Sequence, residues 1–132
     1  MTSLQILLGT IGVLGLIFMM LTVNVQRQRI TTNTHLGDGS GGTGTEALLV
    51  AVRSHANFAE YVPLSLLLIG GIAYAGVNRY LMLGLCVALV AGRIMHPFGM
   101  RLPAPNPLRA GGIILNWVVI LIASFTAIIM AA

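Results

Sequence analysis

Residues 53–75 read RSHANFAEYVPLSLLLIGGIAYA, and this stretch decides how the chain folds. The part from Val62 to Ala75 carries no charge and is suited to lipid. Just before it, Arg53, Asn57 and Glu60 fall on one helix face, within roughly 60° of each other. A charged side chain near the middle of a membrane costs about 2.5–3.5 kcal/mol on insertion scales. The sequence therefore predicts a membrane helix whose polar stripe needs partners from other helices, another subunit or a ligand.

The composition is typical of a protein that lies in the lipid bilayer. Of the 132 residues, 57% are hydrophobic and 8% are charged, whereas a soluble domain carries about a quarter charged residues. Residues 1–26 and 110–132 contain no Asp, Glu, Lys or Arg, and each exceeds the roughly 20 apolar residues that a transmembrane helix needs. No basic residue precedes the first apolar run and no small-residue cleavage site precedes Arg27. We therefore interpret this run as a retained helix and not as a signal peptide.

The charges, the cysteine and the histidines exclude several kinds of site. All seven cationic residues are Arg and the formal net charge is +4, but no basic stripe with interleaved aromatic residues exists, which excludes nucleic-acid binding. Cys86 is the single cysteine, so an intramolecular disulfide is excluded, and its apolar surroundings predict a small core residue. No two histidines stand four residues apart and no cysteine pair exists, so we expect no metal site.

Four helices in a single all-α domain, residues 1–132, account for the chain. In the first helix, Gly9, Gly12 and Gly15 recur at helical spacing and are predicted to be packing contacts. The segment from Thr31 to Thr45 is predicted to be a loop, because residues 36–45 are too rich in glycine to be helical. We expect the helices to span about residues 4–29, 46–75, 80–96 and 107–132.

Prolines and capping residues mark the expected helix ends. Thr45 is a plausible cap for the second helix, and Pro63 is expected to kink that helix just beyond the polar stripe. Pro97 is expected to end the third helix. The pair Asn106-Pro107 is typical of an N-cap followed by the first helical residue, and it predicts the start of the fourth helix.

The placement of arginines predicts the orientation in the membrane. The middle turn carries one arginine, Arg79, and the termini carry none. By the positive-inside rule, the first and third loops are expected on the cytoplasmic side and both termini outside. The five arginines that flank these two loops are Arg27, Arg29, Arg93, Arg101 and Arg109.

This topology brings most of the ionisable side chains, including Glu46, to one end of the bundle. Arg109 lies in the first turn of the fourth helix, where the helix dipole disfavours a cation. A helix N-terminus and a guanidinium together stabilise an anion, such as a carboxylate or a thiolate. His96 follows Arg93 by three residues, so the two share a helix surface. Two alternatives stay open: an interhelical polar network that holds the bundle together, and an interfacial Arg109 that contacts lipid phosphate.

Over nearly its whole length, the chain resembles the MAPEG family (membrane-associated proteins in eicosanoid and glutathione metabolism), particularly its short bacterial members. The second-helix motif is the most specific part of the resemblance. The matching features are the basic pair Arg27 to Arg29, the loop Gly37-Asp38-Gly39, the motif Arg53-x-His55-x-Asn57-x-x-Glu60-Tyr61 followed by Pro63, the motif Gly92-Arg93-x-x-His96, and an arginine that begins the fourth helix.

The resemblance implies a four-helix protomer that forms a homotrimer in a bacterial inner membrane. Glutathione would bind between neighbouring subunits, near the cytoplasmic leaflet. Arg109 corresponds to the arginine that stabilises the glutathione thiolate, and His96 borders the site. Carried over position by position, the glutathione-binding residues are Arg27, Arg53, Asn57, Glu60, Tyr61 and Arg93.

The implied function is a membrane-bound glutathione-dependent transferase or peroxidase that acts on hydrophobic small molecules from the bilayer. Ala110 stands where some members have a serine, and residues 98–100 contain no tyrosine. These departures favour general conjugation or peroxide reduction over eicosanoid synthesis. One alternative is a non-catalytic scaffold or lipid-binding protein that retains the fold. Another is a small four-helix exporter, which is disfavoured because the first helix carries no acidic residue.

Overall fold

The chain folds into a bundle of four long helices with an up-and-down arrangement. The computed structural model describes residues 1–40, 42 and 44–132; positions 41 and 43 of the predicted glycine loop lie outside the described residues. Each helix is long and apolar enough to cross a membrane. The prediction of an all-α membrane bundle is therefore confirmed. The helices are α1 (Ser3–Thr32), α2 (Glu46–Tyr74), α3 (Arg79–Met100) and α4 (Pro107–Ala131).

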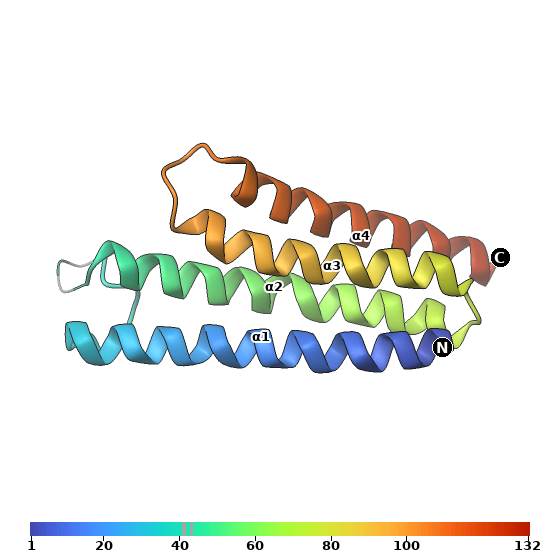
Figure 1. Cartoon of the computed structure of the whole chain (residues 1–132), viewed down its shortest axis with the longest axis horizontal. Helices are drawn as coiled ribbons and strands as arrows, with labels where there is room; N and C mark the ends of the chain where they lie inside the picture. The colour runs from blue at the N-terminus through green and yellow to red at the C-terminus, as the bar shows by residue number, and fades with distance from the viewer. Residues whose placement is uncertain (41, 43) are drawn as a thin grey trace.

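The up-and-down order of the helices places two of the three connections at one end of the bundle and the α2–α3 turn at the other. Figure 1 shows both termini at one end of the bundle, with the α1–α2 and α3–α4 loops at the other. Within the described residues, α1 contacts α2 and α3 but not α4, and α3 makes its most extensive contact with α4. The bundle therefore has α1 and α4 on its outer sides and α2 and α3 between them.

Side chains that bond to the backbone set the helix ends. Thr2 forms a capping box with Gln5 at the start of α1, and the Thr45 hydroxyl accepts from the N–H of Leu48, as the sequence predicts. The helix α1 runs three residues beyond its expected end. Asn33 adopts the left-handed conformation at the C-cap, and the N–H groups of Asn33 and Thr34 donate to the carbonyls of Ile30 and Arg29, which a helix end otherwise leaves without partners.

The expected end of the third helix at His96 is wrong, because α3 continues through Pro97 to Met100. A proline inside a helix removes the hydrogen bond that its own N–H would have made and crowds the carbonyl four residues earlier, which bends a helix without having to end it. Beyond it, the N–H of Arg101 bonds to the carbonyl of Phe98 and closes the last turn. In α2, Pro63 likewise lies inside the helix, as the sequence predicts.

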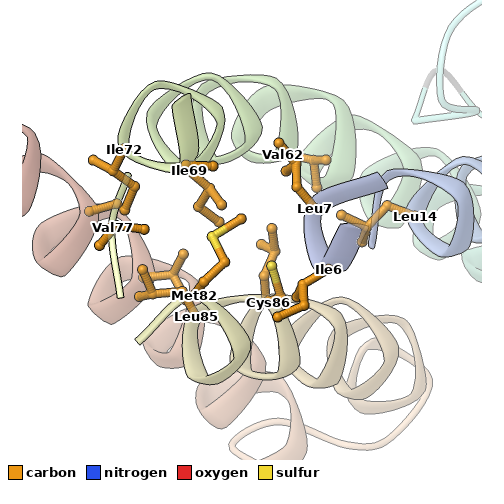
Figure 2. Packing of buried hydrophobic residues seen from close by; sticks show 14 of the residues in the cluster. Ile6, Leu7, Leu14, Val62, Ile69, Ile72, Val77, Met82, Leu85 and Cys86 are labelled. Carbon is orange, nitrogen blue, oxygen red and sulfur yellow. The ribbon is translucent and has the colours of Figure 1, made fainter. Parts of the chain in front are cut away.

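The hydrophobic core fills the end of the bundle near the termini. Figure 2 shows Ile69 of α2 and Met82 of α3 meeting there, with Cys86 close by. Cys86 is buried, as predicted. The hydroxyl of Ser3 donates to the carbonyl of Val77 at 3.0 Å and joins the start of α1 to the α2–α3 turn. The apolar core therefore lies mainly towards the termini, and the polar cavities lie at the opposite end of the bundle.

Glycines control how closely the helices approach. At Gly9, Gly12 and Gly15, an added Cβ would meet nothing within 4 Å. Within the protomer they are therefore not close backbone contacts, although Gly15 lines a cavity together with Phe58 and Val62 of α2; packing of these glycines against a neighbouring subunit stays a prediction. The close contacts lie instead between α3 and α4, where a Cβ on Gly112 would come within 2.8 Å of the Gly92 carbonyl.

Candidate functional site

The end of the bundle opposite the termini contains a cavity of about 690 Å³, here called the arginine cavity. Arg53 enters it from α2, Arg101 from the C-cap of α3 and Arg109 from the first turn of α4. Two carboxylates line the same space: Asp38 from the first loop and Glu46 from the start of α2. The remaining lining comes from Leu49, Val50, Met100 and residues 102–104.

The charges around the arginine cavity are mixed, with an excess of cations. The hydroxyl and then the backbone N–H of Ser40 hold the pKa of the Asp38 carboxyl below its usual value, with a smaller contribution from Arg53. Asp38 is therefore ionised at neutral pH. Three guanidinium groups face two carboxylates among the described lining residues. Such a cavity suits a ligand that carries several negative groups and one positive group.

The backbone of Arg109 is fixed to α3 by a side-chain cap. Asn106 accepts a hydrogen bond from the N–H of Arg109 at 2.9 Å and donates through Nδ2 to the carbonyl of Gly99 at 2.8 Å. A Cβ on Gly99 would overlap the backbone of Arg109. The side chain of Arg109 is exposed in the protomer, so a fixed backbone presents a free guanidinium at the mouth of the cavity.

Arg93, Asn57 and Tyr61 meet in the interior, away from the arginine cavity. Arg93 is 2% exposed and donates to Asn57 Oδ1 at 2.9 Å and to the carbonyl of Gly112 at 3.1 Å. Its guanidinium carbon lies 6.0 Å from the centroid of the Tyr61 ring. This cluster joins α2, α3 and α4. At these residues, the alternative of an interhelical polar network describes the geometry in the protomer.

Two of the three histidines, His55 and His96, pack between helices, whereas His35 is exposed in the first loop. His96 is 4% exposed, and its backbone and Cβ press against Gly112 of α4. It is therefore adjacent to the Arg93 cluster and not among the described residues that line the arginine cavity. His55 faces α1, where its Nε2 lies 3.1 Å from the Thr22 hydroxyl and its ring 4.8 Å from that of Phe18. This agrees with a packing role for His55.

Two more of the predicted site residues lie apart from the arginine cavity. Glu60 is exposed on α2, and the described lining of the cavity does not include it. Arg27 lines a neighbouring cavity of about 580 Å³, which shares Glu46 and Arg101 with the arginine cavity. Within one protomer, the structure thus brings Arg53 and Arg109 together at the arginine cavity and Asn57, Tyr61 and Arg93 together in a second cluster. Arg27 and Glu60 belong to neither group.

Arg101 was not predicted as a cavity residue. It was used for the membrane orientation, but the expected end of the third helix at His96 left it in a connector. Arg101 stands eight residues after Arg93, which on a continuous helix is about 80° round the axis. The sequence therefore relates the position of Arg101 to that of Arg93 only if the third helix is taken to continue through Pro97. Asn116 was also missed: it is 1% exposed, and neither amide atom has a partner among the described residues.

Comparisons with known proteins agree with this architecture. The MAPEG family pattern matches residues 7–129. The chain is 32% identical over 88 residues to the inner membrane protein YecN of Escherichia coli K12, and equally to YecN of Escherichia coli O6:H1. The match covers 66% of this chain and spans 63% of the length of these relatives. No solved structure matches the chain. The family match over almost all of the sequence, together with four membrane-spanning helices, shows that the chain belongs to the MAPEG family.

Proposed function

We propose that the protein is a glutathione-dependent transferase or peroxidase of the membrane, which activates the glutathione thiol against hydrophobic electrophiles from the bilayer. Membership of the family suggests a glutathione-related function at the membrane. The observation that carries the proposal is the arginine cavity, in which Arg53 and Arg109 face a common space at the N-terminus of α4.

The charges of the arginine cavity complement those of glutathione. The tripeptide carries two carboxylates, one ammonium group and one thiol. Arg53 and Arg101 offer guanidinium forks for the carboxylates, and arginine binds carboxylates in a bidentate manner. Glu46 offers a carboxylate for the ammonium group. The volume of about 690 Å³ lies within the range of about 300–1,000 Å³ that is usual for small-molecule sites.

Arg109 would stabilise the thiolate. A thiol with a pKa near 8.5 is only a few per cent ionised at neutral pH, and each unit by which the pKa falls corresponds to about 1.4 kcal/mol. The N-terminus of a helix and a guanidinium both favour the thiolate. The sulfur would then attack an electrophilic carbon: a C–S bond forms, and the leaving group departs with its bonding electron pair. With a hydroperoxide, two glutathione molecules would give the alcohol, water and glutathione disulfide.

The remaining predicted residues fit a site that is completed between subunits. Glu60 and Arg27 are exposed in the protomer, and in a homotrimer a neighbour would bring one or both to the arginine cavity. Arg93, by contrast, is buried. In our proposal it positions Asn57 and α4, to which it donates hydrogen bonds. Direct contact of Asn57, Tyr61, Arg93 or His96 with glutathione stays a prediction.

Calorimetric titration of the detergent-solubilised protein with glutathione tests the proposal. We expect saturable binding with one molecule per protomer, and weaker binding of a glutathione derivative that lacks the glutamyl carboxylate. The matched control is Arg79→Gln, which removes an arginine at the other end of the bundle and should bind like the wild type. Absence of saturable heat at millimolar glutathione would contradict the proposal.

A non-catalytic protein that retains the fold is the second candidate. Ala110, next to Arg109, has no hydroxyl to offer a bound sulfur. Such a protein would bind glutathione without conjugating an electrophile, or would not bind it at all. An assay with a chromogenic aryl halide, run on the same preparation as the titration, separates binding from catalysis.

A further inference from the structure

A second cavity opens between α1 and α3, and no residue of it except Arg93 belongs to the predicted glutathione set. This crevice has a volume of about 380 Å³. Ile17, Met20 and Leu21 line it from α1, and Ile94 and Phe98 line it from α3. Its walls are thus largely hydrocarbon, and they lie on helices that cross the membrane.

The crevice ends in polar groups on the side of the first and third loops. Asn24 of α1 and Arg101 face each other there, and both also line the neighbouring polar cavity that contains Arg27. The Arg101 guanidinium lies 5.8 Å from the centroid of the Phe98 ring, which holds it at the mouth. Because Arg101 is the C-cap of α3, its charge sits where the transmembrane helix ends. We expect this end to lie near the lipid headgroups, on the side where the positive-inside rule places arginines.

A second cation lies at the floor of the crevice. Arg93 lines it while 98% of its surface is buried, and its Nε has no hydrogen-bond partner among the described residues. Arg93 and Arg101 are eight residues apart, about 12 Å along a helix. A buried charge is screened little by salt, so the crevice is electropositive from its floor to its mouth.

We infer that this crevice binds an anionic phospholipid of the leaflet on the side of the first and third loops. One acyl chain would lie along the apolar walls, and the phosphate would meet Arg101 and Asn24. Arginine binds phosphate in a bidentate manner, and basic pockets between transmembrane helices bind anionic headgroups. Apolar walls together with two guanidinium groups favour an anionic phospholipid over an uncharged lipid. Arg101 also lines the arginine cavity, where we propose that it binds a glutathione carboxylate, but the apolar walls of the crevice are not part of that cavity.

Native mass spectrometry of the full chain, with dioleoyl phosphatidylglycerol as the probe, tests the inference. We expect one retained lipid per protomer and at least fivefold weaker binding by Arg101→Gln, since each arginine near an anionic lipid surface contributes on the order of 1 kcal/mol. The matched control is Arg79→Gln, at the other end of α3, which should bind like the wild type. Ile94→Trp, which fills the crevice without removing a charge, should also lose the lipid while still binding glutathione.

Other occupants give different results in the same experiment. Dioleoylglycerol, which has the same chains and no phosphate, should not compete; equal competition would overturn the inference. Displacement of the phospholipid by equimolar oleate would overturn it in favour of a carboxylate amphiphile. If Ile94→Cys readily forms a disulfide between two copies of the chain, the crevice is an interface and not a lipid site. An equal effect of Arg79→Gln and Arg101→Gln would show nonspecific attraction and would also overturn it.

Discussion

Arg109 stands where a cation is least favoured, in the first turn of a helix. The helix dipole and the guanidinium add there, and only an anion relieves the combined positive potential. Asn106 and Gly99 fix the position of the Arg109 backbone and leave its side chain exposed. The single most informative substitution is therefore at this residue.

We expect Arg109→Ala to raise the pKa of the bound glutathione thiol by about one unit, since the thiolate loses its nearest cation. The ultraviolet absorbance of the thiolate should then appear at higher pH and be severalfold lower at neutral pH. Arg79→Ala is the control, and it should leave the absorbance titration in place. An unchanged titration in Arg109→Ala would remove this residue from the proposed role.

The hydrogen bond between Arg93 and Asn57 provides a second prediction at the residue scale. Asn57→Leu leaves a buried guanidinium donor without its partner, and bonds to charged groups contribute about 1.5–3 kcal/mol. The double variant Arg93→Leu/Asn57→Leu removes both partners and should be less destabilised than the sum of the two single variants. Thermal unfolding in detergent measures all three. Strictly additive losses would show that the two side chains are not coupled.

At the scale of the elements, α3 and α4 form one unit because their backbones touch. Gly99→Ala should lower the stability by about 1–3 kcal/mol, as in other overpacked contacts, because its Cβ would overlap the Arg109 backbone. The control is Gly84→Ala in the same helix, where an added Cβ meets nothing within 4 Å. That variant should be neutral or stabilised by up to about 1 kcal/mol. Equal unfolding midpoints for the two would contradict the contact.

The Asn106 side chain makes two different hydrogen bonds at the start of α4, and two substitutions can distinguish them. Asn106→Asp keeps the oxygen that accepts from Arg109 but loses the donor to Gly99, whereas Asn106→Ala loses both. We expect a loss of about 0.5–2 kcal/mol for Asn106→Ala and a smaller one for Asn106→Asp. Glutathione affinity should follow the same order, since the cap positions Arg109. If Asn106→Asp is as weak as Asn106→Ala in both measurements, the Gly99 bond dominates.

The elements were largely predictable, and their ends were not. Long uncharged runs identify membrane helices because hydrocarbon excludes charges. The end of α1 depends on the left-handed cap at Asn33, and α3 continues through Pro97 to Met100. Neither effect has a clear signal in hydrophobic periodicity. Arg101 was missed as a consequence of the second error.

The site was predictable only in part, for a related reason. The face of a single helix can be read from the sequence, and it placed Arg53, Asn57 and Glu60 together. In the protomer, however, Asn57 turns to Arg93 of α3, whereas Arg53 turns to the space beside Arg109. Which side chains meet depends on how closely α3 and α4 approach, and that is decided by glycines whose contacts a single-helix pattern does not describe.

For the whole molecule, the arrangement of the loops predicts its orientation. Both termini lie at one end and five of the seven arginines flank the loops at the other. We expect a C-terminal alkaline phosphatase fusion to be active in Escherichia coli and a C-terminal green fluorescent protein fusion to be dark, as the positive-inside rule requires. A fusion at Gly37, in the first loop, should give the opposite pattern. Fluorescence from the C-terminal fusion would contradict the topology.

The direct contact of the α3 and α4 backbones has a mechanical consequence. With no side chains interposed at Gly92, Gly99 and Gly112, these two helices cannot slide past each other without steric collision, so their register is locked. We therefore expect α3 and α4 to move as one body, so that any change in spacing between helices falls at their contacts with α1 and α2.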